Sequence, residues 1–301
     1  MRIGVAATPD VALPTLNSLF VSSHEIALVI SQPDRAAGRG QEIRSSPVST
    51  WAKSHNIPLI RPESPEELVG VIEDLDCIVT IGYGVLVPEA ILKLPRFGFI
   101  NLHFSILPAY RGAAPVQRAI ENGELTTGVT VFALDKGMDT GPVYCSSTIS
   151  IDPRWRAHEL FNELALIAPE VVEAALTAIS LGQKPTPQSG QASKAPKISK
   201  QEAKIDWKQS ADIVLRRIRA FYPAPIAWCT WKGEGFRVTD AKMNSTSLPP
   251  GEISIIDGWV TVGCGDNRTI TLVTVIPSGK KEMLAIDWAR GARLEIGSHF
   301  G

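Results

Sequence analysis

The 301-residue sequence has little of what disulfide scaffolds, metal sites and membrane spans require. Its four cysteines, at positions 77, 145, 229 and 264, have neither paired nor metal-like spacing, and its five histidines show no ligand spacing. We therefore expect no disulfide framework and no structural or catalytic metal. The apolar run at residues 1–7 is too short to span a membrane and lacks a signal-peptide layout, so a buried first strand explains it better. These absences favour a protein of the reducing cytoplasm with no membrane partner.

The sequence also lacks a large net charge, because its formal balance is only −1. This balance hides an asymmetry: residues 181–301 carry 17 basic and 11 acidic side chains, whereas residues 1–180 carry 13 and 20. Most of the basic excess lies in residues 181–220, at Lys194, Lys197, Lys200, Lys204, Lys208, Arg216, Arg217 and Arg219. A solvated linker face explains most such runs. A basic connector beside an acidic half also suits a polyanionic substrate.

The first 180 residues alternate short apolar runs with longer helical patterns, which is typical of crossover helices around a sheet. We predict an α/β, Rossmann-like domain with a mainly parallel sheet at residues 1–182. The expected strands are residues 3–7, 26–31, 57–60, 75–81, 99–103, 128–134 and 143–151, and the expected helices are residues 8–21, 115–122 and 158–181.

The remaining residues predict a second, smaller domain. Residues 183–203 contain much Pro, Ser, Gln and Lys without apolar periodicity, which indicates a surface linker. A short helix is expected at 211–221, followed by strands at 227–231, 236–241, 251–256, 259–263 and 269–276. Short strands separated by Gly, Pro and Asn favour a small barrel at residues 204–301, although periodicity alone does not distinguish a barrel from a sandwich.

The greatest concentration of possible chemistry lies between residues 97 and 142. Asn101, His103 and Ser105 occupy alternate positions, so an extended strand would place them on one face. Pro108 cannot continue a central strand, which puts this polar face at the strand's carboxyl end. Ligands bind at that end of open α/β sheets. Asp139 follows in a tight turn between two glycines.

Taken singly, His103 is best explained as a core histidine and Asp139 as a turn residue. Together with Asn101 they supply an amide, an imidazole and a carboxylate. Such a set can polarise a carbonyl, move a proton and orient the proton carrier. We therefore predict Asn101, His103 and Asp139 as catalytic residues. Ser105 lacks the context of a nucleophile elbow and is not expected to attack a substrate.

Several motifs resemble the 10-formyltetrahydrofolate-dependent formyltransferases. They are Asn-x-His-x-Ser-x-Leu-Pro at residues 101–108, Arg-Gly-Ala-Ala-Pro-x-Gln-Arg at 111–118, and Asp-Thr-Gly at 139–141. Two further stretches, residues 31–40 and 200–207, are similar to members of this family whose formyl acceptor is methionyl-tRNA. The resemblance extends over nearly the whole chain.

This resemblance implies transfer of a formyl group from 10-formyltetrahydrofolate to the α-amine of initiator methionyl-tRNA, for translation initiation. Asn101 would donate a hydrogen bond to the developing oxyanion, and His103 would help to move protons. Asp139 would favour the imidazolium, because a nearby carboxylate raises the pKa of a histidine. The resemblance also implies that the C-terminal domain is an OB-like barrel that holds tRNA.

The resemblance assigns binding residues as well. The folate-contacting run of the family corresponds here to Ser105, Ile106, Leu107 and Pro108. Arg39 aligns with a basic residue in a loop that reaches the acceptor stem of the tRNA. Lys204 and Lys208 are expected to contact phosphates rather than bases. The acting form is expected to be a monomer.

Three other functions compete with this interpretation. A dinucleotide-dependent oxidoreductase would suit the opening pattern, but the turn at residues 6–10 lacks G-x-G-x-x-G. A non-catalytic RNA-binding protein leaves Asn101, His103 and Asp139 without a purpose. A formyltransferase for a small amine, such as glycinamide ribonucleotide or an amino sugar, uses the same chemistry and remains open. Such an enzyme would not require the basic linker and the barrel.

Overall fold

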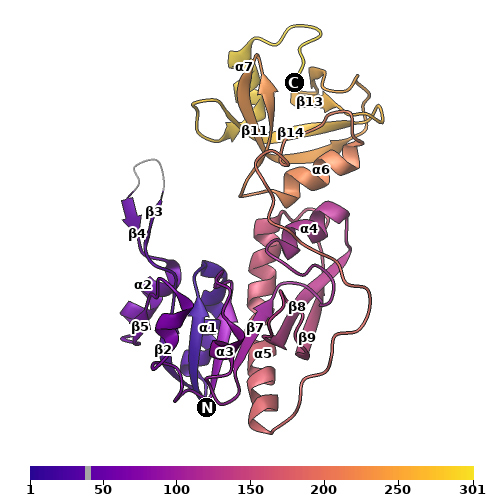
Figure 1. Ribbon diagram of the computed structural model, residues 1–301. Coiled ribbons are helices and arrows are strands. Elements are labelled where there is room, and N and C mark those ends of the chain that lie inside the picture. Colours follow the sequence, from indigo (N-terminus) through magenta and orange to yellow (C-terminus); the bar gives the residue numbers. More distant parts are fainter. Residues whose placement is uncertain (38–41) are drawn as a thin grey trace. The chain divides into compact units, whose positions relative to one another are not determined.

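A computed structural model describes residues 1–37 and 42–301, which form two compact units (Figure 1). Unit 1 comprises residues 1–112, 126–150 and 161–195, and unit 2 comprises residues 113–125, 151–160 and 196–301. Each unit is thus assembled from three separate segments of the chain.

Unit 1 is built on a seven-stranded sheet with the order β5-β2-β1-β6-β7-β8-β9. The neighbours from β5 to β7 are parallel, whereas β7–β8 and β8–β9 are antiparallel. This arrangement confirms the predicted α/β class with a mainly parallel sheet. The strands are β1 (Arg2–Ala7), β2 (Glu25–Ile30), β5 (Leu59–Ile60), β6 (Cys77–Ile81), β7 (Phe99–His103), β8 (Thr126–Ala133) and β9 (Val143–Ser150).

Continuous apolar sequence explains why the central strands lie inside the sheet. All five residues of β6 are buried, as are the last five of β1, because parallel strands are covered on both faces. The long helix α5 (Ala157–Ser180) runs beside β9, and the thiol of Cys145 in β9 donates to the carbonyl oxygen of Val171 in α5. The other elements before β7 are η1 (Asp10–Ala12), α1 (Leu13–Val21), β3 (Arg35–Ala37), β4 (Glu42–Arg44), α2 (Pro47–Ser54), η2 (Pro65–Leu68) and α3 (Glu89–Leu92).

Unit 2 contains an all-antiparallel sheet of six strands with the order β10-β11-β14-β13-β12, and β15 pairs with β14. A cluster of aromatic rings lies at this sheet, where the ring of Phe300 contacts those of Trp207, Phe236 and Trp288. This second, antiparallel sheet is the one that the short strands predicted. The elements are α4 (Pro115–Asn122), α6 (Ala211–Ala220), β10 (Ala227–Trp231), β11 (Glu234–Asn244), β12 (Ile253–Ile256), β13 (Trp259–Gly263), β14 (Thr269–Pro277), β15 (Met283–Leu284) and α7 (Ala285–Ala292).

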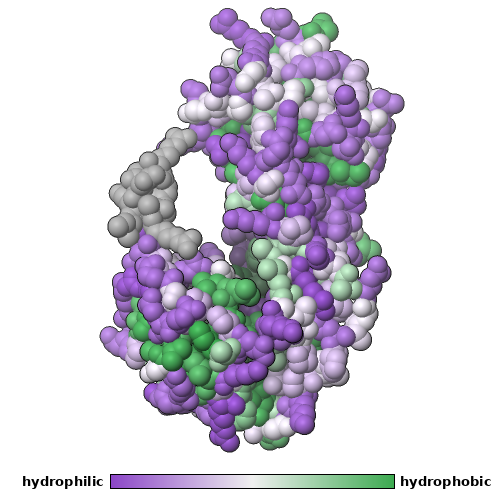
Figure 2. All heavy atoms as spheres, in the orientation of Figure 1, coloured by the Kyte–Doolittle hydropathy of each residue, from purple (hydrophilic) through white to green (hydrophobic). Residues whose placement is uncertain are grey.

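The surface differs between the units. On the face drawn in Figure 2, hydrophobic residues gather in patches on unit 1, whereas hydrophilic residues cover most of unit 2. In residues 1–37 and 42–301, none of the helices combines the length and apolar character needed to cross a membrane.

Candidate active site

The end of β7 positions the amide of Asn101. Thr80, its parallel neighbour on β6, is buried, and its hydroxyl lies 2.7 Å from Oδ1 of Asn101 and 3.0 Å from the carbonyl oxygen of Ile100, so the two acceptors share its single hydrogen. The donor hydrogens of this amide are on Nδ2, which bonds to no residue of the described chain. An oriented amide with free N–H groups can donate a hydrogen bond to an oxygen atom of a ligand.

His103, the last residue of β7, is held by a backbone carbonyl. Its Nε2 lies 2.8 Å from the carbonyl oxygen of Tyr110, whose φ of 62° belongs to the left-handed region. A carbonyl oxygen only accepts hydrogen bonds, so Nε2 must carry the proton. In the neutral imidazole, Nδ1 is then the nitrogen that accepts a proton.

Asp139 lies on the Nδ1 side of this imidazole. Its Oδ2 is 3.7 Å from Nδ1 and accepts a hydrogen bond from the backbone N–H of Gly112 at 2.7 Å. The distance to Nδ1 exceeds that of a direct hydrogen bond but permits strong attraction once the imidazole is charged. The structure thus brings the three predicted catalytic residues together in unit 1.

The charge state of His103 differs from the expectation. Burial lowers the pKa of His103, because only 6% of the residue is exposed, and this outweighs the raising effects of Asp139 and the Tyr110 carbonyl. Asp139 raises the pKa of His103 as predicted, but the expectation of a raised net pKa was wrong, because burial has the larger effect. The lowered pKa favours a neutral ring near pH 7.

The prediction that Ser105 shares the strand face with Asn101 and His103 was also wrong, because β7 ends at His103. Ser105 is fully buried in the turn that follows, and its hydroxyl donates to the carbonyl oxygen of Ala109 at 2.6 Å. Thr130 supports the same turn, since its hydroxyl donates to the Ser105 carbonyl. Of the four residues predicted to bind folate, Ile106 is partly exposed and the other three are buried.

Three residues that complete this site were not predicted. Thr80 orients Asn101, Tyr110 holds His103 through a carbonyl, and Gln188 contacts the turn of Asp139. The register of two neighbouring predicted strands is a signal that points to Thr80. A backbone carbonyl and a glutamine in an aperiodic segment leave no comparable signal in sequence.

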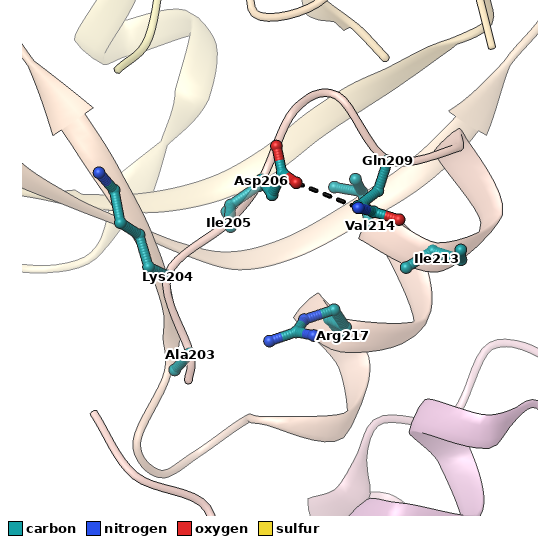
Figure 3. Close-up of a pocket in the computed structure, with 8 residues that line it drawn as sticks. All are labelled: Ala203, Lys204, Ile205, Asp206, Gln209, Ile213, Val214 and Arg217. Carbon is teal, nitrogen blue, oxygen red and sulfur yellow. Dashed lines mark hydrogen bonds between the residues drawn. The ribbon is translucent and has the colours of Figure 1, made fainter. Parts of the chain in front are cut away.

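The residues predicted to bind RNA do not belong to this cluster. Arg39 lies outside the described residues. Lys204 and Lys208 are exposed in unit 2, where Nζ of Lys204 is 5.8 Å from the centre of the Trp228 ring. Lys204 also lines a cavity of about 250 Å³, towards which Arg217 extends from α6 (Figure 3). The other residues that line this cavity are Ala203, Ile205, Asp206, Gln209, Ile213 and Val214.

This arrangement suits transfer of an acyl-type group. Asn101 can offer an N–H to a developing oxyanion, Nδ1 of His103 can accept a proton, and Asp139 can stabilise the resulting imidazolium. Within the described part of the chain, no three His, Cys, Asp or Glu side chains form a group that could hold a metal ion. The expectation of a metal-free reaction stays a prediction.

Comparisons with known proteins agree with this chemistry. A model of the formyl transferase family matches residues 1–176, and a model of the formyl transferase C-terminal domain matches residues 197–293. The methionyl-tRNA formyltransferase of Salinispora tropica is 40% identical over 306 residues, which cover 99% of each chain.

Solved structures with low sequence identity share the fold. HypX from Aquifex aeolicus in complex with tetrahydrofolic acid has a TM-score of 0.69 at 18% identity, over 96% of this chain and 46% of its own. Methionyl-tRNA formyltransferase from Clostridium thermocellum has a TM-score of 0.59 at 17% identity, over 81% and 94%. With both family models matched and a relative aligned over its full length, the chain belongs to the formyl transferase family.

Proposed function

We propose that the protein transfers the formyl group of 10-formyltetrahydrofolate to the α-amine of initiator methionyl-tRNA, which gives N-formylmethionyl-tRNA. The observation that carries this proposal is the joint orientation of Asn101 and His103 at the end of β7. One presents a free amide donor and the other an unprotonated nitrogen beside a carboxylate. Relatives with this activity in their names align with the chain over nearly its full length.

The first role belongs to Asn101. Attack of the amine on the formyl carbon places negative charge on the formyl oxygen, and an amide N–H aimed at that oxygen stabilises the charge. A single donor of this kind contributes roughly 3 kcal/mol to the stability of the transition state. The hydroxyl of Thr80 fixes the amide before the substrate arrives, so little reorganisation accompanies the reaction.

The second role belongs to the pair of His103 and Asp139. The attacking amine loses a proton as the new C–N bond forms, and Nδ1 of His103 accepts it. The imidazolium that results lies 3.7 Å from the carboxylate of Asp139, which offsets the cost of forming a charge in a buried position. The same proton can then pass to N10 of the folate as it departs.

The turn of residues 105–108 would hold the folate beside these groups. Because Ser105, Leu107 and Pro108 are buried, they would act through backbone and shape, whereas Ile106 offers partly exposed apolar surface. Lys204 and Lys208 would contact phosphates of the tRNA, since their exposed ammonium groups suit sequence-independent attraction. Arg39 is proposed for the acceptor stem on the resemblance alone.

A comparison of acceptors tests this function. The purified protein is incubated with 10-formyltetrahydrofolate and either methionyl-tRNA, glycinamide ribonucleotide or a nucleotide-linked amino sugar, and the formylated products are quantified by mass spectrometry. We expect turnover with methionyl-tRNA only, and a loss of roughly 100-fold in kcat for Asn101→Ala. Faster formylation of a small amine would support the alternative acceptor. Full activity of His103→Ala would contradict the catalytic assignment.

A further inference from the structure

The segment after α5 forms part of the active site rather than a free connector. We call residues 186–195 the strap. Thr186 exchanges two backbone hydrogen bonds with Val143, at 2.7 and 2.8 Å. Farther along, the backbone of Ser193 and Ala195 bonds to that of Arg111, at 2.9 and 2.7 Å, and the hydroxyl of Ser193 accepts the N–H of Tyr110 at 2.8 Å. The strap is thus bound beside the residue whose carbonyl holds His103.

Gln188 is the strap side chain with the most complete set of contacts. Its Oε1 accepts from Nε and Nη2 of Arg111, at 3.1 and 2.7 Å. Its Nε2 donates to the carbonyl oxygens of Asp139 and Gly141, at 2.9 and 2.8 Å. A guanidinium only donates and a carbonyl only accepts, so this amide orientation is the only one that satisfies all four bonds.

These contacts act on the turn that carries Asp139, whose carboxylate also accepts the backbone N–H of Gly112 at 2.7 Å. Asp139 has a φ of 56°, in the left-handed region that a non-glycine residue adopts at a cost. Inside the same turn, Asp135 accepts from the N–H of Gly137 and the hydroxyl of Thr140. Gln188 ties the backbone of this turn to the strap, at the residue whose carboxylate faces His103.

We propose that Gln188 is a positioning residue for formyl transfer, which fixes the turn of Asp139 and joins it to Arg111. The contribution to catalysis rests on the proposed function of the site. A neutral amide is required because one end must accept from Arg111 while the other donates to two carbonyls. The side chain of Arg111 has no carboxylate partner among the described residues, so it is held in place without being neutralised.

Three variants test this role. Gln188→Ala removes all four hydrogen bonds. Gln188→Glu keeps the acceptor for Arg111 but places a carboxylate against the two carbonyl oxygens. Gln183→Ala is the matched control, because Gln183 is exposed and its side chain bonds to no described residue. Each variant is compared with the wild type for kcat, KM, melting temperature and the NMR titration of His103.

We expect Gln188→Ala and Gln188→Glu to lower kcat by roughly 10- to 100-fold with little change in KM, as misplacement of a catalytic group does. In Gln188→Ala the His103 titration should also move to lower pH, because the carboxylate that raises the pKa of His103 keeps its bond to the Gly112 N–H but loses the fixed backbone that Gln188 provides. Gln183→Ala should match the wild type in every measurement.

Two results would overturn the proposal. One is wild-type kcat and an unshifted His103 titration in Gln188→Ala. The other is recovery of wild-type kcat by Gln188→Glu, which would assign the whole effect to Arg111. The titration needs no substrate, so it judges the position of Asp139 even if the acceptor proves to be a different amine.

Discussion

At the scale of single residues, the neighbours of His103 decide what it can do. The Tyr110 carbonyl selects the tautomer, burial keeps the ring neutral, and Asp139 provides the charge that an imidazolium requires. The sequence pointed to all three side chains, because their chemistry is visible in their types, and their catalytic role stays a prediction. It did not predict the direction of the pKa change, since burial of His103 depends on residues distant in sequence.

Replacing Asp139 with Asn tests this balance. The carboxylate raises the pKa of His103, so its removal lowers that pKa further. In the proposed mechanism His103 acts unprotonated, so kcat/KM should decline on the acid side as the ring gains a proton. We expect that acid limb below the ordinary histidine value of 6.5 in the wild type, and at still lower pH in Asp139→Asn.

Over the same pH range, kcat of Asp139→Asn should fall roughly 100-fold, because the imidazolium formed in the reaction loses its partner. A pH–rate series for both proteins provides the measurement. An acid limb that moves to higher pH in the variant would contradict the role given to Asp139.

At the scale of elements, the strength of local patterns decided what could be predicted. The expected ranges of β7 and α4 match the observed ones, since each has clear apolar spacing and a proline near one end. The ribbon of β3 and β4 and the helices α2 and α7 were not predicted. The contacts of the strap were not predicted for a different reason. It is held by scattered backbone hydrogen bonds and single side chains, and such contacts produce no periodic pattern of apolar residues in the sequence.

In the turn that carries Asp139, the backbone of Gly141 closely approaches the backbone of Ala133. A Cβ at Gly141 would lie 1.8 Å from the carbonyl oxygen of Ala133, so Gly141→Ala must displace the turn. We expect a loss of about 1–3 kcal/mol in the free energy of unfolding, together with reduced kcat. Urea denaturation and steady-state kinetics measure the two effects.

Gly291→Ala is the control for this substitution. A Cβ at Gly291, in α7, meets no atom within 4 Å, so alanine there should leave stability unchanged or improve it by up to about 1 kcal/mol. Equal stabilities of the two variants would show that the turn accommodates a side chain.

At the scale of the whole molecule, neither unit is a continuous stretch of chain. α4 belongs to unit 2, where Glu121 lies between two arginines: Oε2 is 2.7 Å from Arg118 and Oε1 is 3.4 Å from Arg217. Arg118 also pairs with Glu202 at 2.5 Å. Composition favours a division at residues 183–203, but a change in composition cannot reveal that ion pairs join residues 113–125 to the C-terminal residues.

Glu121→Ala tests how much this ion-pair group stabilises the protein. The Glu121 side chain is 14% exposed, so its loss leaves Arg217 without a carboxylate partner among the described residues and leaves Arg118 with Glu202 alone. We expect a decrease of roughly 3 kcal/mol in the free energy of unfolding. Asp287→Ala is the control, because it breaks an exposed pair with Arg290 and should cost less than about 1 kcal/mol. Similar losses in both variants would count against a structural role for the buried group.

Nitrogen-15 NMR of the His103 imidazole in the wild-type protein tests most directly whether this ring can take the proton of the attacking amine. The proposed role requires a proton on Nε2 and an open Nδ1. We predict a neutral ring at pH 7 with the proton on Nε2, and a titration midpoint below 6.5. A ring that is charged at pH 7, or neutral with its proton on Nδ1, would contradict the account.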